Sequence, residues 1–371
     1  MIDVEATVIG GGMVGCCVAA ALAERNVSTV LLEKEARLAT GVTARNSEVA
    51  HGGMYYPTGS LKAVFCVEGR RLLRQFCQAN DIPYQENGKL IVAVTAAEEP
   101  ELERLLQLGQ ANGVEDLRLV DGDELSRLEP NIKASAALLS PRTGILDAEG
   151  AARAYARLAS EHGAEVLTGA EVTGLARAGD GWRVEVGGGN REGWSHSSRW
   201  VINAAGLGSD RIAALAGIDI VAAGLELSWV KGNYFAIAPE RTGLIQRLIY
   251  PVPPADGSSL GIHVCIDLGG QLRLGPDVEP VAVGSDYGVD PARGARFFES
   301  ASLFLPWLRP DELTPAMAGI RPKLSRDGWG DFYLQRESGD FAGLINLIGI
   351  DSPGLTSGPA IARAVADLLQ V

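Results

Sequence analysis

The chain has 371 residues with 46% hydrophobic side chains, which is long enough for two domains. Its net charge of -13, from 46 acidic and 33 basic residues, repels a phosphate backbone and argues against a nucleic-acid partner. The five cysteines form neither a CxxC pair nor a Cys/His cluster with metal-ligand spacing, so no disulfide framework and no metal centre is expected.

An apolar run at residues 8–23 looks like the hydrophobic part of a signal peptide. The charged residues ahead of it are the acidic Asp3 and Glu5, whereas a secretory leader begins with positive charge. The run is also too short and too rich in glycine to span a bilayer. Together with the cysteine pattern, these features predict a cytoplasmic protein, with peripheral contact at the inner face of the membrane left open.

The N-terminal segment has the pattern of a βαβ unit. Residues 4–9 form an apolar strand pattern, a helical composition follows, and a second strand pattern ends at Glu33. Gly10, Gly12 and Gly15 match the GxGxxG fingerprint, which allows a tight turn, close approach of a pyrophosphate and contact between helix and strand. Glu33 follows at about the 20-residue spacing of the carboxylate that binds ribose hydroxyls. This pattern predicts a dinucleotide site without separating NAD from FAD.

The segment after Glu33 favours one of the two cofactors. Residues 35–53 are polar and interrupted by glycine, unlike the helix that a nicotinamide-binding domain would start here. This stretch resembles the flavin-dependent oxidoreductases of the D-amino acid oxidase superfamily. The resemblance implies FAD as the cofactor and places Thr43, Asn46 and Ser47 along its pyrophosphate and flavin.

A narrower resemblance begins at residues 45–77, which are similar to the L-2-hydroxyglutarate oxidases and dehydrogenases. These enzymes share the pattern H-x-G-x-Y-Y-x-x-G-S-L-K-A, which starts here at His51. Three further segments resemble the same family, at residues 248–253, 260–277 and 318–323. The likeness therefore extends over most of the chain, although the chain lacks some tens of residues of the family pattern between Asp277 and Pro315.

The middle and the end of the chain alternate between helix and strand patterns. Residues 144–167 are typical of an amphipathic helix that leads into a strand. By resemblance, the small residues that end the apolar run 199–206 pass close to the adenosine half of FAD. Residues 226–284 are rich in strand patterns and predict an antiparallel sheet over the flavin. A buried strand near the C-terminus is followed by a glycine loop, residues 354–358, and by a helix that begins near Pro359 and faces the flavin.

These patterns predict a mixed α/β fold with a Rossmann-like FAD-binding domain and an antiparallel-sheet substrate-binding domain. The FAD-binding domain is expected to comprise residues 1–80, 145–225 and 335–371, and the substrate-binding domain residues 81–144 and 226–334. The residues expected to bind FAD are Gly10, Gly12, Gly15, Glu33, Lys34, Thr43, Asn46, Ser47, His51, Gly52, Val172, Ala205, Gly206, Gly354, Leu355 and Thr356.

Oxidation of a hydroxyl group needs a base for the hydroxyl proton, and histidine is the usual choice near neutral pH. Of the four histidines, His162 ends a predicted helix and His196 lies in a polar loop, so both are interpreted as surface residues. His263 is a polar residue in an apolar strand, which by itself favours a hydrogen-bonded core histidine. The family resemblance makes it the preferred base. His51 precedes two glycines and is expected to hydrogen-bond the flavin, orient the substrate or share the proton.

A substrate carboxylate needs a fixed cation. By resemblance, Arg321 is the clamp, since its guanidinium offers two parallel donors. Tyr250, Tyr55 and Lys323 are weaker candidates for polar contacts. A five-carbon diacid would need a second cationic anchor, for which Lys231 is the candidate.

The resemblance predicts FAD-dependent oxidation of a 2-hydroxy acid to the 2-oxo acid, with L-2-hydroxyglutarate favoured. Pro322 is a departure, because the amine-oxidising relatives more typically have proline here and the L-2-hydroxyglutarate enzymes alanine. An oxidase or dehydrogenase of glycine, sarcosine or a D-amino acid stays open. So does a flavin-binding relay subunit without chemistry of its own, although His263 and Arg321 argue against it. The electron acceptor, whether oxygen, a quinone or a partner flavoprotein, and the oligomeric state are left open.

Overall fold

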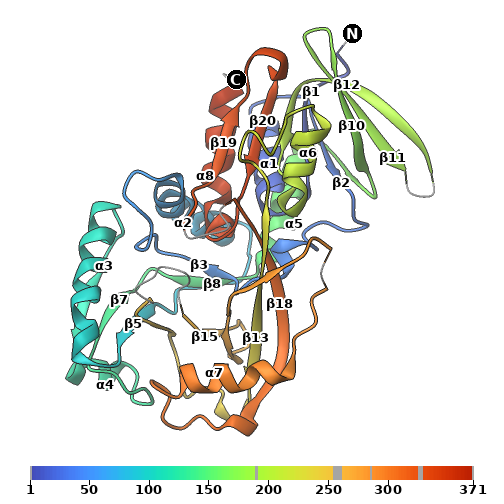
Figure 1. Ribbon diagram of the computed structural model, residues 1–371. Helices are drawn as coiled ribbons and strands as arrows, with labels where there is room; N and C mark the ends of the chain where they lie inside the picture. Colours follow the sequence, from blue (N-terminus) through green and yellow to red (C-terminus); the bar gives the residue numbers. More distant parts are fainter. Residues whose placement is uncertain (1, 189–190, 254–260, 285, 325–328, 370–371) are drawn as a thin grey trace.

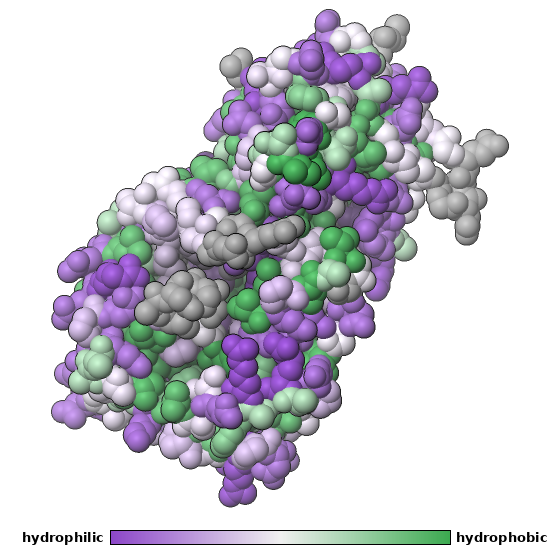
Figure 2. All heavy atoms as spheres, in the orientation of Figure 1, coloured by the Kyte–Doolittle hydropathy of each residue, from purple (hydrophilic) through white to green (hydrophobic). Residues whose placement is uncertain are grey.

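The computed structural model describes residues 2–188, 191–253, 261–284, 286–324 and 329–369. Leu260, the first residue of one family-like segment, lies outside these ranges. The chain forms two lobes, and both termini lie in the upper one (Figure 1). Hydrophilic side chains are spread over both lobes, with apolar ones among them (Figure 2).

The upper lobe contains an eight-stranded sheet. Its strands are β1 (Val4–Ile9), β2 (Thr29–Glu33), β9 (Glu165–Thr168), β10 (Glu171–Ala178), β11 (Gly181–Gly188), β12 (Arg191–Asn203), β19 (Tyr333–Arg336) and β20 (Leu344–Ile348). β20, β12, β1, β2 and β9 are parallel neighbours. The antiparallel pairs are β10 with β11, β11 with β12, and β19 with β20. The strands predicted before Gly10 and up to Glu33 are confirmed, whereas His196 lies in β12 and not in a loop.

Eight α-helices are found in the described residues. They are α1 (Met13–Glu24), α2 (Leu61–Ala79), α3 (Glu99–Ala111), α4 (Gly122–Leu128), α5 (Ala148–Glu161), α6 (Ser209–Leu215), α7 (Gly294–Ala301) and α8 (Gly354–Leu369). α1 packs against both α5 and α8. It is buried along most of its length, which explains why its sequence is apolar on nearly every side. None of these helices combines the length and the hydropathy needed to cross a bilayer.

The C-terminal helix begins earlier than the sequence predicted. α8 starts at Gly354, so the expected loop at residues 354–358 belongs to the helix and Pro359 lies inside it. A proline inside a helix removes one hydrogen bond and crowds the carbonyl of residue i−4. Here that residue is Leu355, beside the helix start, where the backbone has more freedom to adjust. The proline therefore does not mark the first turn.

The lower lobe is built on a nine-stranded sheet. Its strands are β5 (Lys89–Ala93), β6 (Arg118–Asp121), β7 (Ala136–Ser140), β13 (Ser228–Ile237), β14 (Leu248–Pro251), β15 (His263–Ile266), β16 (Leu272–Gly275), β17 (Glu279–Val281) and β18 (Leu313–Lys323). The antiparallel sheet expected from residues 226–284 is confirmed, because the strands within that range pair antiparallel, while β14 also runs parallel to β5 at its other edge. Parallel neighbours need a long connection, and these two strands lie far apart in the sequence.

A small sheet lies between the two lobes (Figure 1). It consists of β3 (Val49–Ala50), β8 (Gly144–Leu146) and β4 (Tyr84–Gln85). β18 pairs along the length of β13 and ends at Lys323. The end of β3 and the end of β18 thus bring residues that are far apart in the sequence to the junction of the lobes.

Candidate active site

The main cavity of the described residues extends from the turn after β1 to the nine-stranded sheet and has a volume of about 1860 Å³. Pockets for one small ligand usually hold about 300–1,000 Å³. The cavity therefore has room for a dinucleotide and a small substrate together.

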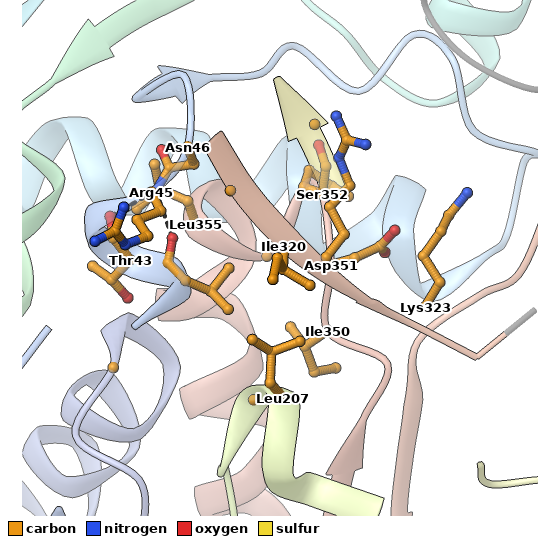
Figure 3. A pocket seen from close by; sticks show the side chains of 18 of the residues that line it. Thr43, Arg45, Asn46, Leu207, Ile320, Lys323, Ile350, Asp351, Ser352 and Leu355 are labelled. Carbon is orange, nitrogen blue, oxygen red and sulfur yellow. Dashed lines mark hydrogen bonds between the residues drawn. The ribbon is translucent and has the colours of Figure 1, made fainter. Parts of the chain in front are cut away.

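Figure 3 shows part of this cavity. Thr43 and Asn46 lie on one side, whereas Asp351 and Lys323 lie on the other, with Ile320 between them. The residues expected to bind FAD that line the cavity are Gly10, Gly12, Glu33, Lys34, Thr43, Asn46, Ser47, His51, Val172, Ala205, Gly206, Gly354 and Leu355. Gly15, Gly52 and Thr356 are not part of the lining.

The glycine turn has the geometry of a pyrophosphate cradle. Gly10 has a φ of +111°, and a Cβ on it would lie 2.5 Å from the carbonyl oxygen of Ala204. A Cβ on Gly15 would lie 1.9 Å from the carbonyl oxygen of Gly10, so helix α1 can approach the turn only with glycine there. Gly12 is the N-cap of α1 and offers no side-chain cap. The helix N-terminus therefore faces the cavity with N–H groups and the positive end of its dipole, which suits a phosphate.

Glu33 and Thr43 hold this turn in place. One carboxylate oxygen of Glu33 accepts the Gly11 N–H at 2.6 Å, and the other accepts the Glu35 N–H at 2.8 Å. The Thr43 hydroxyl accepts the Met13 N–H at 2.9 Å. A carboxylate has about four acceptor positions, so Glu33 can still accept from a ribose hydroxyl. The ribose contact remains a prediction.

We expect Gly15→Ala to lose bound flavin, because the added methyl group collides with the Gly10 carbonyl and forces α1 away from the turn. Overpacking of this kind costs about 1–3 kcal/mol, so the free energy of unfolding should fall by about that amount. Flavin absorbance per protein and a denaturant titration measure both effects. Gly269→Ala is the matched control, since Gly269 is exposed outside the cavity, a Cβ there meets only the Asp267 carboxylate at 3.3 Å, and the variant should keep its flavin. Full flavin content in Gly15→Ala would contradict this account.

The backbone at His51 is fixed from several sides. Its N–H donates to the Thr356 hydroxyl oxygen at 3.0 Å, and that hydroxyl donates to the Val49 carbonyl at 3.3 Å. The Cys66 thiol donates to the His51 carbonyl at 3.4 Å. These bonds join the end of β3 to α2 and to the first turn of α8, whose N-terminal residue Gly354 lines the cavity. The helix dipole there favours negative charge in the cavity.

The His51 imidazole is buried and lines the cavity. Its Nδ1 has no hydrogen-bond partner among the described residues. Burial lowers the pKa of the His51 imidazole well below the ordinary value. The charges of Lys89 and of the other histidine, His263, lower it further. His51 is therefore neutral at physiological pH and has a nitrogen free for a ligand.

His263 is oriented more firmly. Its Nδ1 lies 2.9 Å from the Gly261 carbonyl oxygen, which can only accept, so Nδ1 carries the proton and Nε2 has the lone pair. Nε2 is buried and has no partner among the described residues. The ring stacks on Tyr250 with 3.6 Å between centroids. Burial lowers the pKa of His263 to about 3, with Lys89 and Arg321 lowering it further and the hydrogen bond to Gly261 opposing them.

Two cationic side chains of β18 line the cavity. Arg321 and Lys323 are two positions apart in a strand and so lie on the same face. The Arg321 guanidinium makes one long hydrogen bond, 3.5 Å to the Asp277 carbonyl, and pairs with no carboxylate of the described residues. Burial lowers the pKa of Lys323, as do the neighbouring charges of Arg321 and Lys62, while Asp351 raises it. This face of β18 suits an anionic ligand.

Sequence reasoning missed a buried ion pair and misjudged one lysine. The Lys62 ammonium lies 2.7 Å from the Asp351 carboxylate, and both side chains line the cavity. Lys62 lies in the S-L-K-A part of the family pattern, and that position was the signal from which the lysine could have been chosen as a site residue. Lys231, the expected second anchor, does not line the cavity, and its ammonium donates to the Gly288 carbonyl and lies 3.8 Å from the Asp286 carboxylate. This placement does not favour Lys231 as a substrate ligand.

The chain belongs to the family described as DAO, FAD dependent oxidoreductase, whose model matches residues 5–368. It is an FAD-dependent oxidoreductase, and the glycine turn with the helix N-terminus fits that cofactor. The mitochondrial L-2-hydroxyglutarate dehydrogenase of Arabidopsis thaliana is 35% identical over 409 residues, covering 98% of this chain and 83% of the relative. The Homo sapiens enzyme of the same name is 33% identical, covering 99% and 88%.

Solved structures agree on the fold. The reduced L-alpha-glycerophosphate oxidase of Mycoplasma pneumoniae, with FAD bound, has a TM-score of 0.89 and 26% identity and covers 100% of this chain and 96% of the other. A glycine oxidase from Geobacillus kaustophilus has a TM-score of 0.80 and 22% identity, covering 99% and 94%. The second likeness shows the fold alone.

Proposed function

We propose that the protein oxidises L-2-hydroxyglutarate to 2-oxoglutarate. The observation that carries the proposal is the pair of cations, Arg321 and Lys323, on one face of β18 in the cavity that His263, with its unpartnered Nε2, also lines. Two cations suit a diacid, and a neutral imidazole suits removal of a hydroxyl proton. The L-2-hydroxyglutarate dehydrogenases among the relatives support the same substrate.

Each residue has a distinct part in this reaction. Bound FAD supplies the acceptor for the hydride from the α-carbon. Arg321 holds the carboxylate beside that carbon through two parallel donors, and Lys323 binds the second carboxylate. Nε2 of His263 accepts the hydroxyl proton, while Nδ1 stays bonded to the Gly261 carbonyl and keeps the ring in place. His51 hydrogen-bonds the flavin or the substrate through its unpartnered Nδ1.

Substrate binding makes His263 a stronger base. In the free enzyme the charged groups that act on it, Lys89 and Arg321, are both cations and oppose its protonation. A bound dianion offsets these charges and raises the pKa of the imidazole. The imidazole thus gains proton affinity when the hydroxyl group is present.

The amine-oxidising alternative rests on Pro322, which is buried in β18. A deprotonated amine expels hydride with its own lone pair and needs less help from a base. The neutral His263 with its free Nε2 therefore favours the alcohol. The relay subunit is not better supported, since the cavity contains both a base and an anion-binding face.

An anaerobic titration followed by flavin absorbance tests the substrate. We expect L-2-hydroxyglutarate to bleach the flavin, with glycine, sarcosine and D-amino acids inert. Lys323→Met should raise the concentration needed for half-bleaching by L-2-hydroxyglutarate about tenfold, which corresponds to about 1.4 kcal/mol. L-2-hydroxybutyrate lacks the second carboxylate, so the concentration needed for half-bleaching should be the same in the wild type and in Lys323→Met. Bleaching by an amino acid and not by the hydroxy acid would refute the proposed function.

We propose a cytoplasmic location, since all five cysteines are unpaired and buried. The electron acceptor of the bound cofactor would be oxygen, a quinone or a partner flavoprotein. The rate of reoxidation of the bleached protein by oxygen and by a soluble quinone distinguishes these acceptors.

A further inference from the structure

Lys89 is a buried cation that the sequence did not single out. It is the first residue of β5 and is fully buried, between Ser140 of β7 and Leu248 of β14. Its ammonium has no hydrogen-bond acceptor and no carboxylate partner among the described residues. An ammonium without an acceptor is expensive to bury. A fold that keeps it there has a use for its charge.

The ammonium instead faces the aromatic wall of the cavity. It lies 4.5 Å from the ring centroid of Tyr55 and 4.6 Å from that of Tyr250, so both rings hold it through cation–π contacts. Both tyrosines line the cavity, and both phenol oxygens are buried without a partner among the described residues. Tyr250 also stacks on His263, so Lys89 and the proposed base contact the same tyrosine ring.

We propose that Lys89 is a positioning residue whose positive charge strengthens the phenols of Tyr55 and Tyr250 as donors to an anionic substrate and adds to the resistance of His51 and His263 to protonation. The inference rests on the proposed function of the two histidines. A cation over a phenol ring withdraws electron density from it, which makes the hydroxyl a better donor. The same charge opposes a second positive charge on a nearby imidazole.

The surroundings of Lys89 contain no compensating carboxylate among the described residues. The titratable groups that act on it or feel it are Tyr55, Cys66 of α2, Tyr250 of β14, His263 and Cys265 of β15, and His51. Burial lowers the pKa of Lys89 to about 7, while the thiols Cys66 and Cys265 oppose the shift. Lys89 is therefore charged below about pH 7, a range that includes the pH at which His263 takes up a proton.

Binding of glutarate, a dicarboxylate without a reacting hydroxyl group, tests the proposal. We expect the affinity of the wild-type holoenzyme, measured by flavin absorbance from pH 5.5 to 9, to fall as the pH rises through about 7. Lys89→Met should bind glutarate about tenfold more weakly at pH 6 and lose this pH dependence. Lys89→Arg keeps its charge and should bind equally well at both ends of the range. Lys323→Met should bind more weakly but keep the pH dependence.

A second readout needs no substrate. In histidine-labelled holoenzyme, ¹⁵N NMR from pH 8 down to about pH 2.5 reports the protonation of each imidazole. Lys89→Met should raise the pKa of His51 and His263 by about one unit, the effect of a nearby unit charge at an effective dielectric constant of about 20. His162 and His196 serve as internal controls. Lys133→Met, an exposed lysine outside the cavity, is the matched control variant.

A wild-type glutarate profile in Lys89→Met would overturn the proposal, as would imidazole signals that do not move. If Lys89→Met does not fold, the comparison of wild type with Lys89→Arg decides, and an equal loss of affinity through pH 7 in both would overturn it. Failure of the wild type to bind glutarate would count against the proposed diacid substrate, while the NMR titration would still decide the role of Lys89.

Discussion

Replacing His263 by glutamine is expected to lower the limiting rate of flavin reduction by about 10²–10⁴-fold with little change in substrate affinity. Glutamine keeps a polar side chain of similar size but cannot accept a proton. Anaerobic stopped-flow measurement of flavin reduction separates the rate from the affinity. His51→Gln should lower the rate less and should change the flavin spectrum, because the unpartnered Nδ1 of His51 is free to hydrogen-bond the flavin. His162→Gln, at the exposed end of α5, should reduce flavin at the wild-type rate.

The pH dependence gives the same residue a second test. Activity is lost as the pH falls through the pKa of the base, because a protonated imidazole accepts no proton. Burial and the cations Lys89 and Arg321 lower the pKa of His263 to about 3 in the free enzyme. The acid limb of kcat/KM should therefore lie well below 6.5, and that of kcat at a higher pH, because the bound dianion raises the pKa. An acid limb of kcat/KM near 6.5, or a wild-type rate in His263→Gln, would rule His263 out as the base.

Replacing Arg321 by methionine is expected to weaken substrate binding by about 10²–10³-fold, or about 3–4 kcal/mol. The guanidinium pairs with no carboxylate of the described residues, so it is available for the substrate. Arg321→Lys should recover only part of the loss, because an ammonium cannot make two parallel bonds. The dissociation constant from the anaerobic flavin titration measures each effect.

The control for Arg321 is Arg153→Met on the surface of α5, where the arginine pairs with Glu149. This variant should bind substrate like the wild type. Unchanged affinity in Arg321→Met would refute the assignment of Arg321 as the carboxylate ligand. The carboxylate would then have to be bound by Lys323 or by Tyr55 and Tyr250.

The nucleotide-binding end of the molecule could be predicted from the sequence because its determinants are local. Gly10 needs a positive φ, and Gly15 must lack a side chain for α1 to approach the turn, so consecutive residues record the geometry. The strand–turn–helix pattern that surrounds them is equally local. The family resemblance then indicated FAD, and the matched family model confirmed it.

Two predictions about elements were wrong for identifiable reasons. Pro359 was interpreted as a first-turn residue, but α8 begins at Gly354. Proline statistics describe isolated helix starts and do not include the contacts of α8 with α1 and α2 that hold its first turn in place. The polar run around His196 was interpreted as a loop, but it lies in β12 and pairs with β11, because an antiparallel sheet can have polar residues on its solvent-facing side.

The sequence alone predicted the cofactor and the glycine turn, and it nominated His263, His51 and Arg321 as chemistry-bearing residues. The tertiary structure decided the surroundings of these side chains and, through them, the proton affinity of the imidazoles. The pairing of β5, β14 and β15 buries Lys89 beside Tyr250 and His263, and that burial, together with the charges it brings close, sets the pKa of the imidazole. A strand pattern records which residues are apolar, whereas the proton affinity of a side chain depends on neighbours that come from distant parts of the chain. For that reason Lys89 carried no signal in the sequence and became visible only in the folded molecule.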